Sequence, residues 1–190
     1  MPLIKWHEQR FAQTQIATWG ETIYPSLEKI IRSKEIDLDK DVSYKCRVLY
    51  DSKNTDIQFS VYQQRTINSL VLKNGNDIDY HLKYEDRQQL NALVKDLQQG
   101  EEVLIVRNNL LTETSFTNIA LWNGTQWHTP KIPLLRGVQR SKLIEDKIII
   151  EKNISIQQLS LYQKICLFNA LVDWDNAWEL NTNQIQVHAL

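Results

Sequence analysis

The sequence contains few of the residues that interrupt regular structure. Its 190 residues include only five glycines and four prolines. These two residue types are the commonest markers of turns and of the ends of helices and strands. Neither an internal repeat nor a low-complexity segment is present. We therefore expect helices and strands to make up most of the chain.

Cysteine is also scarce, and long apolar runs are missing. Cys46 and Cys166 lie far apart in apolar surroundings, which predicts two reduced, buried thiols. No stretch approaches ~20 uncharged apolar residues, so we predict no transmembrane helix. The charged residues among the first ten positions do not fit a signal peptide. A cytoplasmic location is therefore the prediction.

The chain has almost no excess of charge of either sign. Lys and Arg number 22 and Asp and Glu number 23, which gives a formal net charge of −1. Net charge therefore gives no reason to expect binding to nucleic acid or to an anionic membrane. No histidines, cysteines and acidic residues are spaced as metal ligands, so we predict no metal site.

The hydrophobic pattern predicts an α+β protein with two small domains, residues 1–77 and 78–190. In the first domain, the pattern predicts two helices, over residues 5–18 and 25–33. Alternation of apolar and polar residues then predicts strands over residues 42–49, 57–61 and 66–73.

The second domain is predicted to mix helices and strands. A helix over residues 85–99 ends at Gly100, and a buried strand covers residues 103–106. A hairpin is expected around Asn123-Gly124, a dipeptide that favours tight turns. The remaining predicted elements are, in order, a helix over 137–147, a strand over 148–154, a helix over 156–163 and a strand over 165–171.

Three segments carry the residues that point to a chemistry. They are Tyr80-His-Leu-Lys83-Tyr-Glu-Asp-Arg87, Leu111-Thr-Glu113-Thr-Ser-Phe-Thr-Asn118-Ile119, and Thr129-Pro130 followed by Leu134-Leu-Arg-Gly137-Val-Gln-Arg140. In this order and spacing, they resemble the class IV pyridoxal-phosphate enzymes, the aminotransferases and aminodeoxychorismate lyases. The resemblance implies two domains with the cofactor cleft between them. It is strongest over residues 113–140 and weaker over nearly the whole chain.

The resemblance implies that Lys83 holds pyridoxal 5'-phosphate as a Schiff base and is the catalytic residue. Lysine is the side chain that supplies an amine for such a bond, and the site must favour its neutral form. Glu113 matches the family's acidic residue that faces the pyridine nitrogen. A carboxylate in that position keeps the nitrogen protonated, which lets the ring accept electrons.

The cofactor's phosphate needs backbone N–H groups and a cation. The helix that starts at Gly137 offers the N–H groups of Val138 and Gln139, which match the family's phosphate cup. Many relatives have Thr in place of Gln139. Arg10, in a His-x-x-Arg element, resembles the family arginine that binds the phosphate, and a guanidinium suits an oxyanion through paired donors.

Three further residues have roles implied by the resemblance. Asn118 is expected to brace the turn before Gly137 rather than to take part in the chemistry. Asn169, in Asn169-Ala-Leu171, matches a segment of aminodeoxychorismate lyases and is expected to face the phosphate or the substrate. Arg47, on a predicted strand of the first domain, is the candidate to bind the substrate carboxylate.

The expected function is therefore that of a pyridoxal-phosphate enzyme acting on an amino substrate. Asn169-Ala-Leu171 favours an aminodeoxychorismate lyase, which releases pyruvate and 4-aminobenzoate for folate synthesis. A class IV aminotransferase of the branched-chain or D-amino acid type is the alternative. A second alternative is an inactive relative that serves as a binding module. It is kept because relatives usually carry a further strand before the His-x-x-Arg helix. Family members pair as homodimers, so a homodimer is expected.

Overall fold

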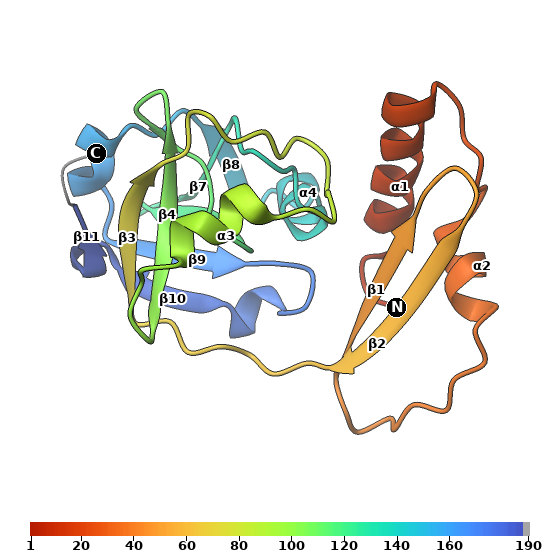
Figure 1. Ribbon diagram of the computed structural model, residues 1–190. Coiled ribbons are helices and arrows are strands. Elements are labelled where there is room, and N and C mark those ends of the chain that lie inside the picture. The colour runs from red at the N-terminus through yellow and green to blue at the C-terminus, as the bar shows by residue number, and fades with distance from the viewer. Residues whose placement is uncertain (188–190) are drawn as a thin grey trace. The chain divides into compact units, whose positions relative to one another are not determined.

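The chain divides into two compact units, Met1–Gln64 and Arg65–Leu190, and each is described by itself. The computed structural model describes residues 1–187 (Figure 1). Among these residues, no helix is long and apolar enough to cross a membrane. Both helices and strands occur in each unit, which confirms the predicted α+β class.

The first unit consists of two helices and a two-stranded antiparallel sheet. The elements are α1 (Ile4–Trp19), α2 (Leu27–Arg32), β1 (Tyr44–Tyr50) and β2 (Thr55–Val61). Phe11 of α1 is buried and packs edge-on against the Tyr50 ring, with 4.7 Å between ring centroids. The predicted helix over residues 5–18 and the period-two strands are confirmed.

The second unit contains a four-stranded and a five-stranded sheet. The four-stranded sheet has the order β11-β3-β4-β5 and uses β3 (Ser69–Asn74), β4 (Glu101–Arg107), β5 (Leu110–Leu111) and β11 (Ile185–Gln186). The five-stranded sheet has the order β10-β9-β6-β7-β8 and uses β6 (Asn118–Trp122), β7 (Trp127–Pro130), β8 (Ile149–Lys152), β9 (Lys164–Phe168) and β10 (Trp178–Asn181). The hairpin predicted around Asn123-Gly124 is confirmed, because β6 and β7 pair antiparallel on either side of it.

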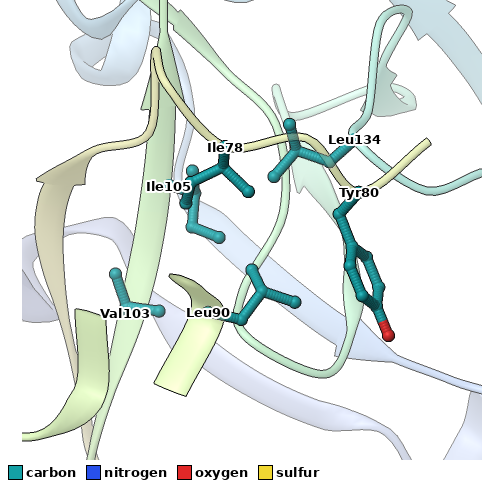
Figure 2. Packing of buried hydrophobic residues seen from close by; sticks show 6 residues of the cluster. All are labelled: Ile78, Tyr80, Leu90, Val103, Ile105 and Leu134. Atoms are coloured by element: carbon teal, nitrogen blue, oxygen red, sulfur yellow. The ribbon is translucent and has the colours of Figure 1, made fainter. Parts of the chain in front are cut away.

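Two helices cover these sheets. Helix α3 (Gln88–Val94) packs on β4 through a cluster of Ile78, Tyr80, Leu90, Val103, Ile105 and Leu134 (Figure 2). Helix α4 (Val138–Glu145) contributes Leu143 to a second cluster with Ala120, Ile149, Cys166 and Phe168 of the five-stranded sheet. Short 3-10 turns complete the unit at Ile156–Leu161, Trp174–Asn176 and Thr182–Gln184. The two apolar clusters hold α3 and α4 against the sheets.

The third strand belongs to a different part of the chain from the one predicted. The sequence placed residues 66–73 in a first domain that ended at residue 77. In the structure, β3 pairs in parallel with β4 and β11, so it is a strand of the second unit, which begins at Arg65. Parallel pairing joins residues far apart in sequence and leaves no local signal of the partner.

Two predicted helices also differ from the structure. The helix predicted over 85–99 is only Gln88–Val94, and residues 156–163 form a 3-10 turn over Ile156–Leu161. The apolar face of the predicted α3 helix is real, since Leu90 is buried in the cluster with Val103. Propensity and periodicity define such a face but not where the helix ends.

Candidate functional site

Lys83 lies in an irregular segment between β3 and α3. Its side chain is exposed, and its positive charge lowers the pKa of the Glu113 carboxyl, so the two residues share one electrostatic environment. The segment is joined to the loop that follows Glu113 by Arg87, whose Nη2 donates to the Ser115 carbonyl oxygen at 2.6 Å. The charge of Lys83 therefore acts on the Glu113 carboxyl, and the roles predicted for the two residues stay predictions.

Glu113 is a buried acid between β5 and β6, with 6% of its surface exposed. Its carboxyl accepts hydrogen bonds from the backbone N–H groups of Leu134 and Leu135. Burial raises the pKa of Glu113 to about 8, although these two amides and the charges of Arg140 and Lys83 lower it. A carboxyl with that pKa can hold a proton near neutral pH and give it to a basic nitrogen placed against it.

The turn that supplies the two amides is braced by Asn118. Asn118 Nδ2 donates to the Leu135 carbonyl oxygen at 3.0 Å, and Gly137 N donates to Asn118 Oδ1 at 3.1 Å. Asn118 therefore has the bracing role predicted for it. Gly137 is required here because a Cβ at this position would lie 2.0 Å from Asn118 Oδ1. Its backbone, with φ −67° and ψ 148°, is open to any residue, so the requirement is one of space.

Helix α4 starts immediately after this turn. Its N-cap residue, Gly137, has no side chain that could cap the helix, whose first residues are Val138 and Gln139. The first amides of a helix have no carbonyl partner within it and carry partial positive charge, which suits an oxyanion. Val138 and Gln139 are both buried, and the phosphate contacts predicted for them use their backbone amides.

Asn169 follows directly after β9 at the same end of the five-stranded sheet. Phe168, the residue before it, is paired with Asn118, which in turn binds Gly137. Asn169 Oδ1 accepts a hydrogen bond from Leu171 N at 2.9 Å, which fixes the turn after the strand. Asn169 therefore lies near the start of α4, and its predicted contact with phosphate or substrate stays a prediction.

The two remaining predicted residues belong to the first unit. Arg10 is a half-buried residue of α1, and Arg47 is an exposed residue of β1 opposite Gln58. Their roles in binding the cofactor and the substrate stay predictions. The other predicted residues, Lys83, Glu113, Val138, Gln139 and Asn169, all belong to the second unit.

Arg140 is a structural residue to which the sequence reasoning gave no role. It is 2% exposed, and its Nη2 donates to the Pro130 carbonyl oxygen at 2.8 Å and to Glu151 Oε1 at 2.7 Å. Burial lowers the pKa of Arg140, while the bond to Glu151 raises it. These contacts tie α4 to the ends of β7 and β8. The signal that could have indicated this is the position of Arg140 at the end of the Gly-x-x-Arg motif.

Residues 60–175 match the amino-transferase class IV family. An uncharacterized protein of Haemophilus influenzae is 33% identical over 127 residues, which are 67% of this chain and 68% of that protein. The family match covers Lys83, Glu113, the start of α4 and Asn169.

Solved structures agree with the family match. The crystal structure of a candidate 4-amino-4-deoxychorismate lyase from Haemophilus somnus has a TM-score of 0.81 and 32% identity. The match covers 90% of this chain and 89% of that one. The pyridoxal-phosphate-bound form of a hypothetical aminotransferase from Mycobacterium tuberculosis has a TM-score of 0.69 and 14% identity, over 94% of this chain and 75% of that one. At that identity, the second likeness shows the fold alone.

Proposed function

This chain belongs to the amino-transferase class IV family of pyridoxal-phosphate-dependent enzymes, and from that premise we propose how its residues serve the cofactor and which reaction they catalyse. Lys83 holds the cofactor through its Nζ, and Glu113 faces the pyridine nitrogen. The amides of Val138 and Gln139 bind the phosphate, with Arg10 as its cation and Asn169 beside it. When bound, the cofactor withdraws electrons from the substrate's α-carbon.

The buried Glu113 carboxyl carries this proposal. Two backbone amides occupy part of its acceptor capacity, and a carboxylate has about four lone-pair positions, so room remains for a third donor. Because its pKa is about 8, Glu113 is able to share a proton with a pyridine nitrogen near neutral pH. The start of α4 suits the dianionic phosphate, because the first backbone amides of the helix have no carbonyl partner within it.

The remaining residues act on the substrate. Arg47 is proposed to bind its carboxylate, since a guanidinium forms paired hydrogen bonds with a carboxylate. The Lys83 amine, when free, takes the proton from the α-carbon and returns it later in the reaction, as a general base and acid.

The reaction we propose is that of a 4-amino-4-deoxychorismate lyase, with release of pyruvate and 4-aminobenzoate for folate synthesis. The match to the Haemophilus somnus candidate lyase over 90% of this chain supports this choice, as does the Asn169-Ala-Leu171 segment. We further propose a cytoplasmic homodimer. Light scattering of the purified protein tests the homodimer, because one chain has a mass of 22.4 kDa.

Absorbance spectroscopy tests the cofactor site. Wild-type protein mixed with pyridoxal phosphate is expected to develop the visible band of lysine-bound cofactor, and borohydride is expected to fix the cofactor on Lys83. Lys83→Ala abolishes both, whereas the exposed control Lys131→Ala keeps both. A band that persists in Lys83→Ala would contradict the proposal that Lys83 binds the cofactor.

Product assays then test the reaction. Wild-type protein is expected to release pyruvate from 4-amino-4-deoxychorismate. If the protein instead transfers an amino group between branched-chain or D-amino acids and keto acids, without releasing pyruvate, its reaction is that of an aminotransferase and the proposed lyase activity is wrong. Cofactor binding without either activity would favour the binding-module alternative.

A further inference from the structure

Three hydrogen bonds in series connect the backbone next to Lys83 with the loop that follows Glu113. The Tyr80 hydroxyl donates to the backbone carbonyl oxygen of Tyr84, the residue after Lys83, at 3.1 Å. Arg87 Nη1 donates to the Tyr80 hydroxyl oxygen at 2.9 Å, and Arg87 Nη2 donates to the Ser115 carbonyl oxygen at 2.6 Å. We call these contacts the Tyr80–Arg87 bridge.

Both ends of the bridge are anchored in the folded unit. Tyr80 is 5% exposed and belongs to the cluster with Leu90 and Leu134, with its hydroxyl pointing away from the aliphatic side chains (Figure 2). At the other end, Ser115 N donates to the buried carboxylate of Glu102 at 3.2 Å. The Arg87 guanidinium also lies over the Tyr80 ring, 5.5 Å from its centroid, which adds a cation–π contact.

The segment that needs such an anchor has little regular structure of its own. Between the end of β3 at Asn74 and the start of α3 at Gln88, the structure shows turns and bends but neither helix nor strand. A reactive amine in such a segment must be held close to one geometry by neighbouring side chains. Arginine suits this task because its planar head presents several donors in a fixed arrangement, while lysine offers a single point charge.

We propose that Tyr80 and Arg87 are positioning residues of the active site, which hold the Lys83 segment in a fixed place relative to Glu113. This inference rests on the proposed function, in which Lys83 binds the cofactor. Neither residue has to touch cofactor or substrate. They act through the Tyr84 carbonyl next to Lys83 and through the Ser115 carbonyl two residues after Glu113.

The test compares two variants that cut the bridge with one that does not. Tyr80→Phe removes the hydroxyl and keeps the buried ring, and Arg87→Lys keeps the charge but replaces the planar pair of donor nitrogens by one ammonium group. Tyr84→Phe is the matched control, because the Tyr84 ring is 37% exposed and its hydroxyl contacts only the His81 ring among the described residues. Its backbone carbonyl, which the bridge uses, is unchanged.

Two measurements are made on each protein. The first is the pH midpoint at which the visible band of lysine-bound cofactor changes. Both bridge variants are expected to move it by about half a pH unit, a threefold change in the proton equilibrium, and the control leaves it in place. The second is hydrogen exchange of residues 81–87 without cofactor, which Tyr80→Phe is expected to speed at least about fivefold, because it removes two hydrogen bonds. Exchange in β4 serves as the internal reference.

The outcomes separate this inference from the function on which it rests. A wild-type chain without the visible band contradicts the proposed function, and the positioning role falls with it. A wild-type chain with the band contradicts the positioning role alone if both bridge variants keep its pH midpoint. Unchanged exchange of residues 81–87 in Tyr80→Phe contradicts it as well, without reference to the cofactor.

Discussion

Gly137→Ala is expected to destabilise the second unit through one steric contact. The added Cβ would lie 2.0 Å from Asn118 Oδ1, closer than real Cβ contacts come, so the Asn118 side chain must move. The backbone at Gly137, with φ −67°, accepts alanine without strain. Any loss of stability in Gly137→Ala therefore reports on the close contact between Gly137 and Asn118 at the start of α4.

The size of the effect follows from what Asn118 loses. Its side chain makes two hydrogen bonds, to Leu135 O and from Gly137 N, each worth about 0.5–1.5 kcal/mol net. Crowding a packed site costs about 1–3 kcal/mol more. We expect Gly137→Ala to lower the free energy of unfolding by about 2–6 kcal/mol, and Asn118→Ala, which loses only the two bonds, by about 1–3 kcal/mol.

The double variant decides whether the contact is the cause. Once Asn118→Ala has removed the side chain, the methyl group of Gly137→Ala has room, so the double variant should be nearly as stable as Asn118→Ala alone. Urea unfolding followed by tryptophan fluorescence measures all four proteins, since Trp122, Trp127, Trp174 and Trp178 lie in this unit. Effects that simply add, within about 0.5 kcal/mol, would refute the steric reasoning.

Two predictions concern the dependence of stability on pH. The pKa of Glu113 is raised from 4.5 to about 8, so the folded chain holds a proton that the unfolded chain releases, and stability falls as pH rises between these values, by up to about 1.4 kcal/mol per pH unit. Thermal unfolding of cofactor-free Glu113→Gln should lose this slope, and profiles parallel to wild type would contradict it. Burial lowers the pKa of His128, whose Nδ1 lies 3.0 Å from the Tyr162 hydroxyl oxygen. Its contribution to stability is complete above the ordinary histidine pKa of 6.5 and is lost as pH falls below it, so His128→Asn should flatten the acid side of the profile. An acid limb equally steep in His128→Asn and wild type would refute this.

Helices and strands could be predicted where the residue pattern within one segment was sufficient to identify them. The alternating residues of β1 and the apolar run of β4 required no knowledge of partners, and Asn123-Gly124 marked its hairpin by turn chemistry. The short strands β10 and β11 were not predicted. Strand β11 consists of Ile185 and Gln186 alone and exists because it pairs in parallel with β3, more than one hundred residues earlier.

In the candidate site, too, the sequence predicted some features and only the structure showed others. The ordered motif from Lys83 to Arg140 identified the family, and the comparisons confirmed it. The same motif did not show that Leu134 N and Leu135 N bind the Glu113 carboxyl. That contact joins backbone groups to a side chain about twenty residues away, and no spacing rule specifies it.

What the sequence by itself determined is the chemical inventory: a lysine, an acid, a glycine that opens a helix, and the family in which this set occurs. Only the tertiary structure decided the state of these groups. The pKa of Glu113 depends on how completely the fold removes it from water, and the place of Lys83 depends on a bridge from Tyr80 through Arg87 to Ser115. Burial and long-range hydrogen bonds are properties of the packed chain, because they arise only when segments distant in sequence meet.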